Sequence, residues 1–202
     1  MRTRGHAAFT LLELLAVIAL IGLLAALIFP AFGAARRSAG KAKTKVQFAQ
    51  WTAAIESFRA EYGYYPAFDA SGLVNGGVTP TDHLFHDLLA ARKRDGSALA
   101  PTDAAAQQNR KLLALHLFGE GELDAAGLVR DAFENTALAV LTDRDLDGVI
   151  KEGTDFTTLP AVGGLTPGAA DFPPTGIRAG VIFYAPVPGD TAANPGFIFS
   201  WK

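Results

Sequence analysis

The chain has 202 residues, a formal net charge of -2, 50% hydrophobic residues and no cysteine. This length allows one membrane segment and one domain with its own core. The balanced charge argues against nucleic acid as a partner, and the lack of cysteine excludes disulfides, thiolate metal sites and a cysteine nucleophile.

The N-terminal region combines a short basic start with a long apolar run. Residues 1–8 carry two arginines and no acidic residue, and nothing from Leu14 to Phe32 is charged. Extended back to Phe9, the run reaches the length of a bilayer-spanning helix. Glu13 interrupts it, although a carboxylate in lipid is costly unless it is neutralised or paired. A cleaved secretory signal and a plain signal anchor are the alternatives; the run is long for the first, and the second leaves the carboxylate unexplained.

The stretch "AAFTLLELLAVIALIGLLAALIFP" resembles the class III signal of type IV pilins and of the pseudopilins of type II secretion systems. The resemblance implies that a prepilin peptidase cuts between Ala8 and Phe9 and that Phe9 is then N-methylated. Glu13 becomes the fifth residue of the mature chain. Gly22 and Pro30 fall where the family has residues that loosen the helix. Ala8 departs from the glycine that the family has before the cut, which leaves the efficiency of cleavage open.

The resemblance also supplies a partner for the carboxylate. It implies that Glu13 meets the free amine of Phe9 on a neighbouring copy in an assembled fibre. Pairing two groups that are each costly in an apolar core recovers much of that cost. The alternative is a glutamate near the membrane interface that snorkels outward.

A second helical stretch is predicted to follow, over residues 33–62, with a local kink at Pro30 and Gly33. Large apolar residues recur there at spacings of three and four, which indicates one helix face: Phe48, Trp51, Ile55, Phe58 and Tyr62. We expect this aromatic stripe to pack against a globular domain in preference to forming a coiled coil. Gly63 and Pro66 are expected to end the helix.

The predicted fold class is α+β and pilin-like. A long N-terminal helix, with its first half in the membrane, packs on a small C-terminal antiparallel sheet. The expected domains are a leader at 1–8, a hydrophobic transmembrane and fibre-core helix at 9–32, its amphipathic continuation at 33–62, and a globular domain at 63–202.

Periodicity and turn residues predict the elements of the globular domain. Helices are expected over 82–93, capped by Asp82, and over 104–119. Residues 121–140 are expected to be short helix or loop. Strands are expected at 179–186 and 196–202, where β-branched and aromatic residues flank a turn-rich spacer. In the resembled family this spacer binds calcium; here it offers only Asp190 and Asn194.

The stretch "LTDRDLDGVIKEGTDF" resembles the first half of an EF-hand calcium loop. Alternate carboxylates converge when a glycine, here Gly148, permits a sharp turn, and Ca²⁺ prefers oxygen ligands. The twelfth loop position is Thr154 where an EF-hand has glutamate, so Asp155 or Glu152 has to close the site. The alternative is an exposed turn between two strands. The expected ligands are Asp143, Asp145, Asp147, the main-chain carbonyl of Val149, and Asp155.

No constellation of nucleophile, base and acid stands out, so we do not expect an enzyme. The resemblance, strongest to the major pseudopilins, implies a structural subunit of a pseudopilus that supports type II protein secretion. Implied partners are the prepilin peptidase, copies of itself and other pseudopilins, and an inner-membrane assembly platform. The implied location is the bacterial inner membrane, crossed once with the C-terminal domain in the periplasm, and then a periplasmic fibre.

Other readings remain open. The chain could be a type IV pilin or a minor pilin-like subunit of another fibre system. It could also be a membrane-anchored calcium-binding module that forms no fibre, or an anchored enzyme whose site the sequence does not reveal.

Overall fold

The structure is a computed structural model that describes residues 10–68, 70–76, 83–189 and 196–202, without the side chains of residues 27–31. The chain divides into two units, Met1–Gly40 and Lys41–Lys202. The first contains the start of helix α1, and the second contains its end and every other helix and strand of the described residues.

Helix α1 runs from Leu11 to Tyr62. It ends where the sequence predicts, because Gly63 adopts a positive φ of 81° and its N–H donates to the carbonyl of Arg59. The helix is continuous through positions 30 and 33, and the loosening expected there stays a prediction.

The last part of α1 forms the centre of the globular core, as the aromatic stripe predicts. Phe48, Trp51, Ile55 and Phe58 are fully buried. The ring of Phe48 stacks on that of Phe183 at 5.4 Å, and Trp51 meets the same ring edge-on at 5.7 Å. The predicted packing of the helix on a C-terminal sheet is therefore confirmed.

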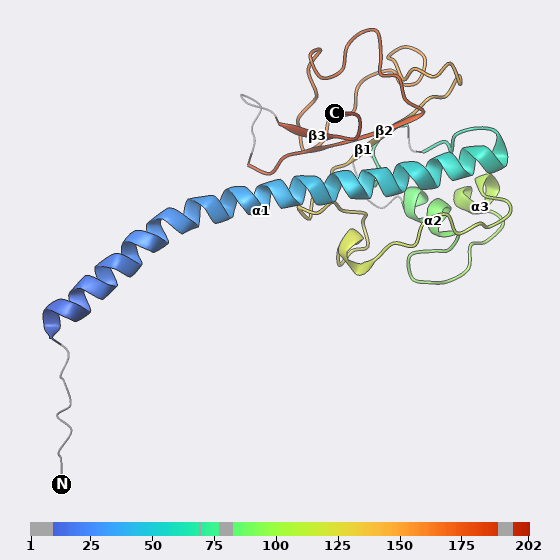
Figure 1. The fold of residues 1–202 in the computed structure, drawn as a ribbon. Helices are drawn as coiled ribbons and strands as arrows, with labels where there is room; N and C mark the ends of the chain where they lie inside the picture. The colour runs from blue at the N-terminus through green and yellow to red at the C-terminus, as the bar shows by residue number, and fades with distance from the viewer. Residues whose placement is uncertain (1–9, 69, 77–82, 190–195) are drawn as a thin grey trace. The chain divides into compact units, whose positions relative to one another are not determined.

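The sheet has three antiparallel strands in the order β1 (Ala139–Thr142), β2 (Val181–Pro186) and β3 (Phe197–Phe199). Strands β2 and β3 confirm the two predicted strands with shorter bounds. The expectation of short helix or loop over residues 121–140 was wrong at its end, where β1 begins. Alternate residues of β2 pack toward α1 and toward loops that contain Ile150 and Val162. Both faces of the sheet are thus covered (Figure 1).

The remaining helices are short: α2 (Leu84–Ala90), α3 (Ala104–Gln108) and the 3-10 helix η1 (Glu120–Glu122). Helix α2 confirms the one expected at 82–93, but the residue at its cap position is His83, which makes no side-chain capping bond. Asp82 lies outside the described residues. The helix expected over 104–119 was wrong beyond Gln108.

Buried Asn109 explains why α3 stops early. Its amide nitrogen donates to the carbonyls of Leu88 and Leu113, at 2.9 and 2.8 Å. Its amide oxygen accepts from the hydroxyl of Tyr62 and the N–H of Leu113. The next residues then run beside α2, where the N–H groups of Leu115 and His116 donate to the carbonyl of Leu89. These tertiary bonds replace the helical ones, because buried polar groups need partners.

Replacing Asn109 with alanine is expected to lower the free energy of unfolding by about 3 kcal/mol, because several buried groups lose their partner at once. Urea unfolding of the full chain in detergent, followed by tryptophan fluorescence, measures this change. Exposed Gln107→Ala is the matched control and should stay within about 0.5 kcal/mol of the unsubstituted chain. Equal losses for the two variants would contradict the assigned role of Asn109.

Candidate functional site

The first turn of α1 is closed by a capping box. The N–H and the hydroxyl of Thr10 both donate to Oε2 of Glu13, each at 2.9 Å. In return, the N–H of Glu13 donates to the hydroxyl oxygen of Thr10 at 3.2 Å. This exchange satisfies main-chain donors that a helix start leaves without partners. Glu13 therefore has a local structural role in addition to the partner expected in a fibre.

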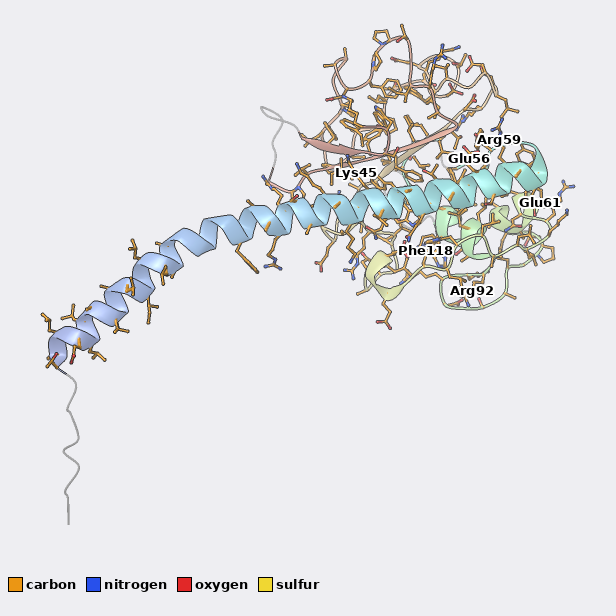
Figure 2. All side chains as sticks on the ribbon, viewed as in Figure 1. Lys45, Glu56, Arg59, Glu61, Arg92 and Phe118 are labelled. Atoms are coloured by element: carbon orange, nitrogen blue, oxygen red, sulfur yellow. The ribbon has the colours of Figure 1, made fainter. Side chains whose placement is uncertain are left out.

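The apolar side chains after this cap are uncovered. Every large apolar side chain from Leu11 to Leu24 is at least 49% exposed. Figure 2 shows them standing out around the first turns of the helix. A Cβ added at Gly22 would meet no atom within 4 Å. Packing among the described residues thus explains neither the apolar surface nor the glycine.

The proposed cleavage site, Ala8 and Phe9, lies outside the described residues, as does the side chain of Pro30. Glu13 and Gly22 both lie on α1, about two and a half helical turns apart at 3.6 residues per turn. In the part of the chain that the structure describes, no helix combines the length and apolar character needed to cross a membrane.

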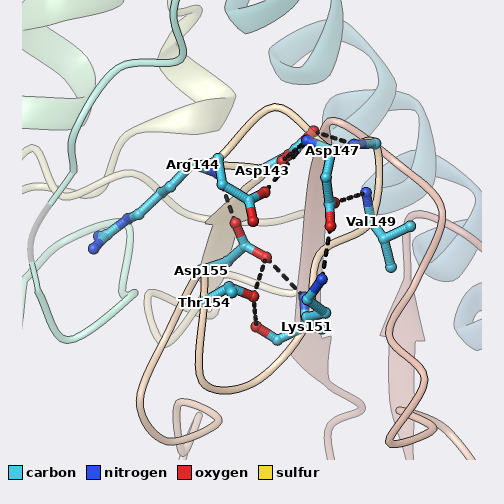
Figure 3. Close-up of polar contacts among 9 residues, drawn as sticks. Asp143, Arg144, Asp147, Val149, Lys151, Thr154 and Asp155 are labelled. Atoms are coloured by element: carbon cyan, nitrogen blue, oxygen red, sulfur yellow. Dashed lines mark hydrogen bonds and ion pairs between the residues drawn. The ribbon is translucent and has the colours of Figure 1, made fainter.

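A loop rich in aspartate follows strand β1 directly (Figure 3). Asp143, Asp145 and Asp147 each offer a carboxylate oxygen, and these oxygens all lie within 4.8 Å of one another. Positive φ angles at Leu146 (63°) and Gly148 (84°) produce the tight turn. The structure therefore brings together the three aspartates that the sequence pattern singles out.

Asp143 organises the turn from its buried side. It is 2% exposed, and its two carboxylate oxygens accept the N–H groups of Asp147 and Gly148, at 3.2 and 2.8 Å. Burial raises the pKa of this carboxyl above its ordinary value. Its own N–H donates to the carbonyl of Gly180 at 2.9 Å, which ties the loop to the start of β2.

Asp155 braces the other end of the loop. It is 2% exposed; Oδ1 accepts the N–H of Arg144 at 2.6 Å and Oδ2 accepts that of Lys151 at 2.9 Å. It is not one of the three converging carboxylates. Glu152, the other residue expected to close the site, is exposed, and its main chain forms an isolated β-bridge with Phe156.

A lysine ammonium already contacts the aspartate group. The Nζ of Lys151 lies 2.6 Å from Oδ2 of Asp147, and this pair holds the pKa of Asp147 below and that of Lys151 above their ordinary values. The N–H of Val149 donates to the other oxygen, Oδ1, at 2.8 Å. The loop thus brings three carboxylates together, and the ammonium of Lys151 pairs with one of them.

A carboxylate network that the sequence patterns do not single out anchors the last part of α1. The indole N–H of Trp51 donates to Oε1 of Glu122 at 2.8 Å, and Nε2 of His116 lies 3.1 Å from the same atom. The N–H of Gly119 donates to Oε2 at 2.9 Å. The network links α1 to the segment that contains η1 through groups 71 positions apart in the chain.

Glu122→Gln is expected to make the chain less stable near neutral pH, by about 1–2 kcal/mol. Burial opposes the charged form of Glu122, but the hydrogen bonds that it accepts hold the pKa of its carboxyl below the ordinary 4.5. Its contribution is therefore present above pH 4.5 and is lost as pH falls through the lower, folded-state pKa. Urea unfolding of both forms across this acidic range measures the difference. A difference that grows on acidification would contradict the network.

Comparison with known proteins gives one match, to a protein family. The family described as prokaryotic N-terminal methylation motif matches residues 3–29. No curated protein and no solved structure matches the chain. The motif is a class III signal and is consistent with the type IV pilin-like family.

Proposed function

We propose that this protein is a pilin-like fibre subunit, and more specifically a pseudopilin of a type II secretion system. One observation carries the proposal: the methylation motif at residues 3–29 extends into a capped helix whose apolar side chains are not covered by any other residue that the structure describes. Such a surface needs lipid or other copies around it. The proposed role is structural and not catalytic.

The proposed sequence of events follows from this surface. The chain first resides in the bacterial inner membrane as a single-pass protein with its globular domain in the periplasm. Prepilin peptidase removes the leader before Phe9, and an inner-membrane assembly platform transfers the helix into a periplasmic fibre. There, copies of the chain and other pseudopilins replace lipid around the apolar side chains, so most of the hydrophobic contact is retained.

Expression of the full chain with prepilin peptidase and an assembly platform tests the proposal. We expect the mature chain in a sedimentable fibre fraction, and we expect its deletion in the native host to trap secreted proteins in the periplasm. Surface fibres with normal secretion would favour a type IV pilin or another fibre system. A cleaved chain that never leaves the membrane fraction would contradict fibre assembly.

We also propose that the aspartate loop binds Ca²⁺. Asp143, Asp145 and Asp147 supply converging carboxylate oxygens, the donors that calcium prefers. The carbonyl of Val149 and the carboxylate of Asp155 are the proposed further ligands. Bound calcium would neutralise the mutual repulsion of these side chains and hold the loop between β1 and β2. If the chain binds calcium but forms no fibre, it is a membrane-anchored calcium-binding module.

A further inference from the structure

Two arginines follow the apolar part of α1 after one helical turn. Arg36 and Arg37 are exposed, and the guanidinium of Arg36 lies over the ring of Phe32 at 5.8 Å. Arg36 takes part in none of the ion pairs found among the described residues. No acidic residue occurs anywhere between Glu13 and Glu56. Arg36 thus has no carboxylate near it in the sequence.

Helix geometry sets the depth of these arginines once the apolar run is in a bilayer. The run from Leu14 to Phe32 is about 28 Å long at 1.5 Å per residue, which matches a hydrocarbon core of about 30 Å. Arg36 lies about 6 Å further along the axis, within the layer of lipid head groups. Its contact with Phe32 places a cation on an aromatic ring at this boundary, where amphipathic groups are favoured.

We propose that Arg36 and Arg37 bind the phosphates of anionic phospholipids in the leaflet that the C-terminal end of the apolar run reaches. A planar guanidinium donates two parallel hydrogen bonds to a phosphate, and anionic head groups attract basic segments next to a span. This inference rests on the proposed membrane stage and not on fibre assembly.

The proposal also accounts for a conflict in the sequence. Five cations follow the apolar run: Arg36, Arg37, Lys41, Lys43 and Lys45. The positive-inside tendency would keep this end of the segment in the cytoplasm, whereas the proposed function places it in the periplasm. Binding to anionic lipid gives Arg36 and Arg37 a function on the periplasmic side and fixes the depth of the helix before assembly.

Electron paramagnetic resonance of spin-labelled lipids tests the proposal. The full chain is reconstituted in phosphatidylcholine vesicles with a trace of spin-labelled phosphatidylglycerol or spin-labelled phosphatidylcholine. We expect the immobilised lipid to favour phosphatidylglycerol by roughly fivefold at low salt, the ratio that corresponds to the attraction between one basic side chain and anionic lipid. High salt should reduce this preference, because it screens charges at the membrane surface.

The double variant Arg36→Gln and Arg37→Gln should bring the preference close to one. The matched control, Arg92→Gln with Arg110→Gln, removes the same charge from exposed arginines of the globular domain and should retain it. A wild-type preference of one, or a preference that the first double variant retains, would overturn the proposal. If that variant instead weakens self-association in detergent, the arginines face acidic groups of a second copy and the lipid proposal is also overturned.

The same spectra separate this inference from the proposed function. An immobilised phosphatidylcholine component shows that the helix lies in the bilayer, whatever the lipid preference. If that component is present without a preference, only the arginine proposal fails. If no lipid is immobilised, the membrane stage of the proposed function fails as well.

Discussion

Replacing Glu13 with alanine is expected to reduce fibre assembly by more than about a hundredfold, because in the proposed fibre it would leave the amine of Phe9 on a neighbouring copy buried without its partner. The amount of mature chain in the sedimentable fraction measures this loss. Leader cleavage should continue, since the substitution lies beyond the cut.

A second substitution separates this role from helix capping. Glu13 accepts two hydrogen bonds from Thr10, so Glu13→Ala also removes the capping box. Thr10→Val removes the hydroxyl of the same box and leaves the carboxylate in place. We expect Thr10→Val to assemble at close to the normal level. Equal losses for both variants would show that the cap, and not a partner on another copy, explains the effect of Glu13.

Calcium at about one hundred times its dissociation constant is expected to raise the melting temperature of the full chain by about 5–10 °C. This follows from a linkage contribution of about 2.7 kcal/mol in a protein of this size. Asp145→Asn should abolish most of the increase, because it removes one of the three converging carboxylates. Asp145 is exposed and supports the turn through one 3.3 Å hydrogen bond, so its replacement tests calcium binding more than folding. Calorimetric scans with calcium and with a chelator measure the shift.

Two further variants complete the calcium test. Asp171→Asn removes a carboxylate that pairs with Lys202 elsewhere in the domain, and it should leave the calcium-dependent shift unchanged. Lys151→Gln removes the ammonium that contacts Asp147, so calcium should bind more tightly. A wild-type melting temperature that does not respond to calcium would contradict the proposed site.

Local patterns were sufficient to predict α1 and the hairpin of β2 and β3. The aromatic stripe has a strong helical period, and Gly63 supplies the positive φ that ends the helix. Strand β1 could not be predicted in this way. It exists because Val140 bonds to the carbonyl of Gly72 and pairs with Phe183 across 43 positions of sequence. The end of α3 depends in the same way on the tertiary bonds of Asn109.

The candidate site was predictable to different degrees. Alternate aspartates before a glycine indicated the turn that the structure contains. The bracing role of Asp155 depends on main-chain groups that no spacing rule identifies. The capping box was visible as Thr-Leu-Leu-Glu, a known helix-start pattern. The pilin-like motif indicated a second role for Glu13, as the partner of an amine on a neighbouring copy. Only an experiment that also substitutes Thr10 separates this role from helix capping.

Mass spectrometry of the N-terminal peptide of the mature protein tests the central claim most directly. The chain should begin at Phe9 and carry one methyl group on its α-amine, because the proposed function assigns both modifications to the methylation motif matched at residues 3–29. A chain that still begins at Met1, in cells whose prepilin peptidase processes other substrates, would contradict the pilin-like pathway.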